Sequence, residues 1–130
     1  QNNEANFIRA QCSLKDDQGA TAKTGPGIPN FESKVWKNMK VKWIADVDAD
    51  SKNTGYEAAI EQIIMKISPE SDENFFDKTI LAGNSGMVIA KVKDSNIEDY
   101  LYYYDILFSV KPKKGDKLFF QIDPILKGNN

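Results

Sequence analysis

The chain contains no histidine, a single cysteine, Cys12, and a single arginine, Arg9, among its 17 basic residues. Histidine is the usual general acid or base near neutral pH, and serine or cysteine nucleophiles usually need one beside them. One cysteine can form neither an intrachain disulfide nor a thiolate metal cluster. The scarcity of arginine argues against the readout of nucleic-acid bases. We therefore expect a protein that is not an enzyme, carries no cofactor and does not bind nucleic acid.

Long apolar runs are also missing. No segment approaches the roughly 20 consecutive apolar residues that a transmembrane helix requires, so we expect a soluble protein with no transmembrane segment. The 130 residues are predicted to form one β-rich domain, 1–130, because a chain of this length buries enough surface for an ordinary core. The chain begins at Gln1 rather than methionine, which would fit the removal of a secretory signal. The expected location is therefore secreted, periplasmic or at the cell surface.

The most regular pattern lies between residues 100 and 124. Every even-numbered residue from 100 to 110 is apolar, and so are residues 118, 120 and 122. This alternation predicts a β-hairpin with one continuous apolar face. The two apolar sets share a face only if Val110 lies opposite Leu118 and Phe108 lies opposite Phe120. That register implies a loop of residues 112–116.

Two further strands are predicted from alternation at residues 8–14 and 87–92. The first would place Cys12 on its buried face as a structural thiol. The second would follow a tight turn at residues 83–86, which read Gly-Asn-Ser-Gly. Residues 16–34 are rich in aspartate, glycine, threonine, lysine and proline, and we expect a long loop there.

A strand at residues 39–47 is predicted with Trp43 as a core anchor. Lys40 and Lys42 alternate with its apolar residues. We interpret these lysines as the solvated face of a half-buried strand, and the competing interpretation is a phosphate-binding strip.

The segment 56–67 fits two structures. Thr54 and Glu57 resemble a capping box, and Ser68-Pro69 would stop a helix. Its apolar residues also recur at helical spacing, at positions 56, 59, 60, 63, 64 and 67. Against a helix, Ile60 and Ile63 can also sit in a bulged strand, and a sandwich would use a strand at this place.

Two fold classes follow from this ambiguity. The first is an all-β fold, an antiparallel β-sandwich of about seven strands. The alternative is an α+β fold, with one helix at about residues 55–67 packed on an antiparallel sheet.

The odd-numbered side of the terminal hairpin is a candidate partner-binding surface, because it carries apolar residues that a core on the even side would leave uncovered. These residues are Leu101, Tyr103, Leu107 and Phe119. The partner would be a second copy of the chain or another protein, through this face or through an exposed strand edge. The competing interpretation is cover from within the same chain, by the long loop 16–34 or by the segment 56–67. Phe75 and Phe76 offer a further apolar plug, of which we expect one residue to enter the core while its neighbour points elsewhere.

One spacing suggests a metal site. Asp46, Asp48 and Asp50 are spaced like the first three ligands of a calcium loop, and Glu57 stands where a bidentate carboxylate would belong. The sixth position of the motif, where a sharp turn needs glycine, is Ser51. If calcium binds, we expect a weak structural site that stiffens this loop.

The pattern as a whole favours a non-enzymatic β-sandwich module that acts in assembly or protein binding, at the cell surface or in the envelope. An alternative hypothesis is a calcium-assisted domain that binds carbohydrate or a small ligand. A third hypothesis is a hydrolase with an all-carboxylate site, although adjacent carboxylates such as Glu98 and Asp99 lie in polar, loop-like stretches.

Overall fold

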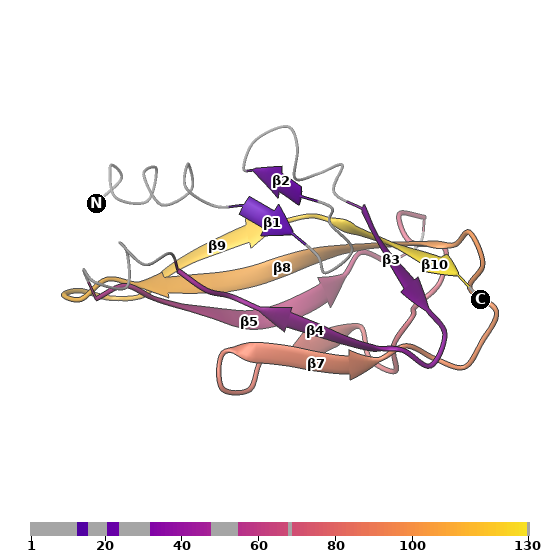
Figure 1. Cartoon of the computed structure of the whole chain (residues 1–130), viewed down its shortest axis with the longest axis horizontal. Helices are drawn as coiled ribbons and strands as arrows, with labels where there is room; N and C mark the ends of the chain where they lie inside the picture. The colour runs from indigo at the N-terminus through magenta and orange to yellow at the C-terminus, as the bar shows by residue number, and fades with distance from the viewer. Residues whose placement is uncertain (1–12, 16–20, 24–31, 48–54, 68, 130) are drawn as a thin grey trace.

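The computed structural model describes residues 13–15, 21–23, 32–47, 55–67 and 69–129 (Figure 1). All the regular structure in these ranges is β-strand, so the predicted all-β, sandwich-like fold is confirmed. The ten strands are β1 (Ser13–Lys15), β2 (Thr21–Lys23), β3 (Glu32–Trp36), β4 (Lys40–Ile44), β5 (Glu57–Met65), β6 (Ile80–Ala82), β7 (Met87–Lys91), β8 (Leu101–Lys111), β9 (Leu118–Ile122) and β10 (Ile125–Asn129).

The long strand β8 organises the large sheet, whose order is β3-β10-β8-β5-β6 with β9 also paired to β8. β5 occupies one edge of β8, while β9 and β10 share the other edge. Val110 lies opposite Leu118 and Phe108 opposite Phe120, so the predicted hairpin register is confirmed. The even-numbered residues of β8 from 102 to 110 are buried, as the alternation predicted.

The last strand, β10, continues the line of β9 along β8. Leu126 lies opposite Tyr102 in the same register that places Phe120 opposite Phe108. The two strands are separated only at residues 123 and 124. Pro124 has no N–H to donate, which explains why the ladder is broken at this point.

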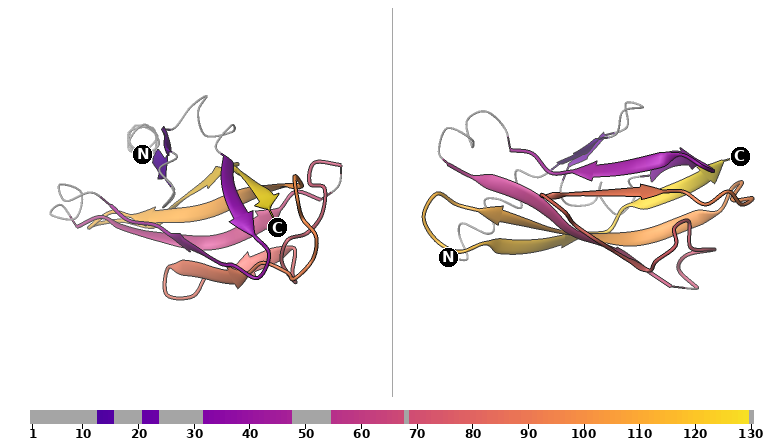
Figure 2. Two further views of the ribbon diagram at one scale, coloured as in Figure 1. Left: turned by 45° about the vertical axis from the view of Figure 1, so that its right-hand side comes forward. Right: turned by 90° about the horizontal axis from the view of Figure 1, so that it is seen from below.

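Strands β4 and β7 form a second layer over β5 and β8 (Figure 2, right). Trp43 of β4 is 8% exposed, and its ring meets the ring of Tyr104 edge-on at a centroid distance of 5.9 Å. Its Nε1–H donates a hydrogen bond of 3.3 Å to the Tyr104 hydroxyl. Trp43 is therefore the core anchor that the sequence predicted, and it joins the two layers.

Phe75 and Phe76 both enter the core, so the expectation that only one would do so is wrong. Phe75 stacks on Tyr102 and Phe76 meets the same ring edge-on, each at a centroid distance of 5.3 Å. The two residues lie in an irregular segment between β5 and β6, where neighbouring side chains need not alternate as they do in a strand. Asn74 supports this conformation by accepting a hydrogen bond from the Phe76 backbone N–H at 2.9 Å.

Strand β5 replaces the helix that the alternative fold placed at residues 55–67, so that alternative is wrong. Its pairing with β8 shifts by one residue between Ile60 and Gln62, at a β-bulge. Ile60 and Ile63 are 7% and 0% exposed, because the extra residue lengthens the step between inward-facing side chains from two residues to three. This one long step imitates the spacing of a helix.

The turn before β7 packs against this bulge. Gly83 N donates a hydrogen bond of 2.7 Å to Glu61 O, and Ile60 N donates one of 2.9 Å to Gly86 O. A Cβ at position 83 would collide with the Ile60 carbonyl oxygen, so glycine is required for this close approach. The tight turn predicted at residues 83–86 is confirmed, and it also stabilises the bulge.

The N-terminal part departs from the prediction where it was expected to be a loop. The long loop expected at 16–34 contains β2 and the start of β3, which pairs in parallel with β10. The sandwich is therefore not wholly antiparallel, and it has more than the seven strands expected. β3 and β10 are short and far apart in the chain, so local alternation carries no sign of their pairing.

The strand expected at 8–14, with Cys12, lies mostly outside the described residues, and β1 pairs antiparallel with β2.

Two buried tyrosines on β8 differ in how their hydroxyls are satisfied. The Tyr104 hydroxyl accepts the Trp43 hydrogen bond, whereas the Tyr102 hydroxyl is buried and has no hydrogen-bond partner in the described part of the chain. Burial raises the pKa of both hydroxyls above the ordinary tyrosine value, so both are neutral at physiological pH.

We expect the two Tyr→Phe variants to differ in stability. Tyr102→Phe removes a hydroxyl that has no partner among the described residues, so the free energy of unfolding should stay the same or rise by up to about 1 kcal/mol. Tyr104→Phe leaves the buried Trp43 N–H without its acceptor and should cost about 1 kcal/mol or more. Urea denaturation of the two variants measures the difference. Equal losses would contradict this account of the core.

Candidate functional site

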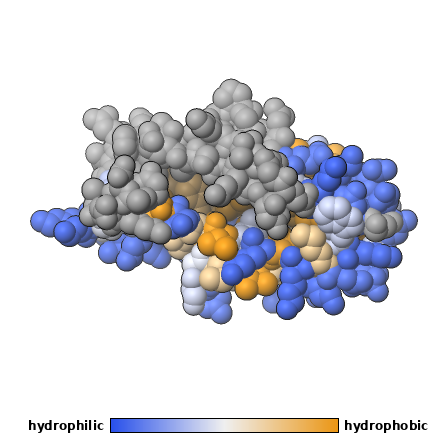
Figure 3. Space-filling view, in the orientation of Figure 1, coloured by the Kyte–Doolittle hydropathy of each residue, from blue (hydrophilic) through white to orange (hydrophobic). Residues whose placement is uncertain are grey.

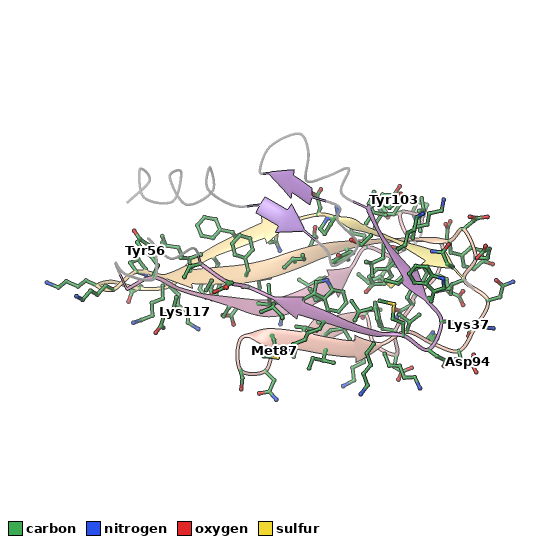
Figure 4. All side chains as sticks on the ribbon, viewed as in Figure 1. Lys37, Tyr56, Met87, Asp94, Tyr103 and Lys117 are labelled. Atoms are coloured by element: carbon green, nitrogen blue, oxygen red, sulfur yellow. The ribbon has the colours of Figure 1, made fainter. Side chains whose placement is uncertain are left out.

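The four residues of the predicted partner surface lie on one face of the large sheet. We call this the outer face, because it is turned away from β4 and β7. Leu101, Tyr103 and Leu107 are odd-numbered residues of β8, and Phe119 of β9 lies opposite Ser109 of β8. The three β8 residues are half-buried, while Phe119 is 58% exposed. Tyr103 lies at the opposite end of the sheet from Lys117, which directly precedes β9 (Figure 4).

An ion cluster divides the outer face. Lys66 Nζ lies 3.6 Å from Asp105 Oδ1 and 3.4 Å from Asp123 Oδ2. Because Asp105 stands in β8 between Tyr103 and Leu107, the charges separate the Tyr103 end of the face from the Leu107 end. Partly exposed pairs of this kind add little stability, but a partner that covers them must remove their water. The four predicted residues therefore do not form one continuous apolar surface.

Two apolar residues that the sequence interpretation missed complete the Leu107 end. Ile64 of β5 lies opposite Asp105 and so shares the outer face, and Ile80 of β6 lies opposite Ile64. Ile64 is half-buried and Ile80 is 49% exposed. Their outward direction depends on the bulge in β5, so only recognition of that bulge could have assigned them to this face.

These side chains form a diagonal line across four strands. Leu107 lies opposite Gln62 and Gln121, which makes Ile64 and Phe119 its diagonal neighbours. Diagonal neighbours in an antiparallel sheet are close enough for long or aromatic side chains to interact. We call the line the outer patch, and it consists of Phe119, Leu107, Ile64 and Ile80.

A polar cluster borders the outer patch at the bulge. Ser109 is 2% exposed, and its hydroxyl donates a short hydrogen bond of 2.6 Å to Glu61 Oε2. Lys117 Nζ lies 3.4 Å from the same oxygen. The Ser109 hydrogen bond, assisted by Lys117, holds the pKa of Glu61 below its ordinary value although burial opposes the shift. Glu61 is therefore ionised at neutral pH, which is the opposite of what a general acid needs.

The candidate calcium ligands are only partly within the described residues. Asp48 and Asp50 lie outside them. Asp46 is exposed and its Oδ1 accepts a hydrogen bond of 2.9 Å from Val47 N, while Glu57 is an exposed residue at the start of β5. No cluster of three or more potential metal ligands occurs among the residues that the structure describes. Calcium binding remains a prediction.

Comparisons with known proteins identify no relative. No family model, no curated protein and no solved structure matches the chain. Among the described residues, no helix has the length and apolar character to cross a membrane. The function is therefore inferred from the geometry of the surfaces.

The Glu61 cluster makes a testable prediction about pH. Because the folded-state pKa of Glu61 is lowered, the cluster stabilises the fold at pH values above the ordinary pKa of an unfolded glutamate. This contribution is lost as the pH falls through the lower folded-state pKa. Ser109→Ala should raise the Glu61 pKa toward its ordinary value, as measured by NMR titration of the side-chain carboxyl.

Lys117→Met provides the matched control, since it removes the other partner of Glu61, which is more distant at 3.4 Å and half exposed to solvent. It should raise the Glu61 pKa by less than Ser109→Ala does. A larger effect from the lysine would show that charge attraction, rather than the serine hydrogen bond, sets the state of this carboxylate.

Proposed function

We propose that the protein is a non-enzymatic β-sandwich module that acts in assembly or protein binding through the outer patch. The observation that carries this proposal is the exposure of Phe119, an aromatic side chain that stands 58% exposed on a sheet face instead of in a core. Phenylalanine, tyrosine and tryptophan are enriched at protein interfaces, because one ring removes a large apolar area from water with little loss of conformational freedom.

The surroundings of Phe119 support a binding role. The outer patch runs from β9 to β6, so it extends over several strands of a rigid sheet. Its borders are polar, with the Glu61–Ser109–Lys117 cluster on one side and the Lys66–Asp105–Asp123 cluster on another. An apolar centre with a polar rim is the usual anatomy of a protein interface.

Self-association is the simplest form of this function, since two copies can meet through the same patch in a two-fold symmetric dimer. The ionised Glu61 also agrees with a binding role, because a carboxylate held by a hydrogen bond and a lysine is a fixed charge that can orient a partner.

The experiment is light scattering on a size-exclusion column over a concentration series, with calcium and with a chelator. We expect concentration-dependent dimers of the native protein in both conditions. Phe119→Ser/Ile80→Ser removes the two exposed ends of the outer patch and should weaken the dimer by about thirtyfold or more, as expected for interface hot spots.

Ile67→Ser is the matched control, because Ile67 is 62% exposed but follows β5 outside the outer patch. It should leave the dimer unchanged. A dimer that persists in the Phe119→Ser/Ile80→Ser variant would exclude the outer patch as the interface. Association that appears only with calcium would favour the calcium-assisted alternative.

A further inference from the structure

The β4–β7 layer has its own solvent-facing side, on the opposite side of the molecule from the outer face (Figure 2). In β4, Trp43 points into the core, so its neighbours Lys42 and Ile44 point outward. In β7, Val88 is buried and Ile89 points outward. We call this side the cationic face, and its residues are Lys40, Lys42, Ile44, Met87, Ile89 and Lys91.

The charge on the cationic face is of one sign. Lys40 lies directly opposite Lys91, and Lys42 lies one step further along β4 on the same side. None of these three lysines is within ion-pair distance of a carboxylate in the part of the chain that the structure describes. Like charges directly opposed in a sheet are destabilising, so a bound anionic partner would relieve a repulsion that the free protein carries.

One acidic side chain, Asp94, stands at the end of the layer where Lys40 and Lys91 pair. Asp94 follows β7 and accepts a hydrogen bond of 2.9 Å from the Asn38 side chain, in the turn between β3 and β4. Lys37 and Asp94 lie together at one end of the layer, and Met87 lies at the other end (Figure 4). Asp94 therefore borders the cationic face and does not lie within it.

Exposed apolar side chains stand among the lysines. Ile44 and Ile89 are 61% and 58% exposed. Lys42 lies opposite Ile89 and Ile44 opposite Met87, so the two isoleucines are diagonal neighbours with lysine beside them. Figure 3 shows apolar and hydrophilic side chains side by side over β4 and β7. The apolar groups thus share one surface with the positive charge.

We propose that the cationic face docks on an anionic membrane surface, with the lysines at the lipid phosphates and Ile44 and Ile89 at the boundary with the acyl chains. Lysine attracts phosphate as a point charge without directional demands, and its long apolar stem can lie along an interface while the ammonium group stays among the headgroups. Basic residues beside exposed apolar ones are typical of surfaces that lie on anionic lipids.

An acidic protein is the competing occupant, and the composition of the face argues against it. Of the types enriched in protein interfaces, the cationic face contains one methionine, Met87, but neither arginine nor an aromatic residue, and half of its residues are lysines, which such interfaces contain less often. This inference goes beyond the proposed function, since it concerns the other side of the molecule. While the cationic face lies on a membrane, the outer patch would remain accessible to a protein partner.

The test is cosedimentation of the full chain with vesicles of phosphatidylcholine alone or mixed with phosphatidylglycerol. We expect binding only to the mixed vesicles and a decrease in binding as salt increases. Each lysine near an anionic surface strengthens binding by about fivefold, so Lys42→Glu/Lys91→Glu should reduce the partition coefficient by at least about twenty-fivefold. This variant should still fold, because the change at position 91 replaces the repulsion from Lys40 across the two strands by an attraction.

Matched controls separate the site from net charge and from general apolarity. Lys113→Glu/Lys114→Glu makes the same charge change in the exposed β8–β9 turn and should reduce binding far less. Ile89→Ser should weaken binding, whereas Ile67→Ser should not. Failure of the native protein to bind the mixed vesicles, or full binding by Lys42→Glu/Lys91→Glu, would overturn the proposal. Displacement by soluble polyglutamate with no effect of Ile89→Ser would also overturn it, in favour of an acidic protein partner.

Discussion

The pairing of β8 along both of its edges is the constraint on which the rest of the structure depends. Its eleven residues form ladders with β5 on one side and with β9 and β10 on the other. Because side chains alternate along a strand, this pairing assigns each β8 residue to the core or to the outer face. Tyr104 is thereby placed to meet Trp43, and Leu107 is placed beside Phe119. The core and the candidate partner surface are two sides of one strand.

The bulge in β5 connects the fold to the surface chemistry. It keeps Ile60 and Ile63 in the core and leaves Glu61 free to reach Ser109 on the outer face. Bulges often redirect a side chain in this way. The close approach of Gly83 to the bulged backbone holds the turn before β7 against the large sheet. One inserted residue thus positions both a surface carboxylate and the strand that carries half of the cationic face.

The sequence was most informative where burial and periodicity coincide. The hairpin register and the anchoring role of Trp43 followed from alternation alone, because one face is buried and a slip of one residue would expose it. Periodicity failed at the bulge, where the three-residue step to Ile63 imitates a helix. It could not reveal the parallel pairing of β3 with β10, which joins distant segments, and it missed Ile80, whose strand has only three residues. The candidate site was therefore half predicted: Phe119 and Leu107 came from the pattern, whereas Ile64 and Ile80 needed the three-dimensional register.

The outer face and the cationic face differ in chemistry and lie on opposite sides of β8. Both depend on the pairing of β8 with its neighbours. Amide hydrogen exchange followed by NMR tests this claim most directly. The account predicts that the β8 amides from Ile106 to Val110, paired on both edges, exchange only through global unfolding, and that the amides of β4 and β7 exchange faster through local opening of that layer. Exchange of the β8 amides as fast as those of β4 would contradict it, because the second layer would then be at least as stable as the strand that is meant to organise it.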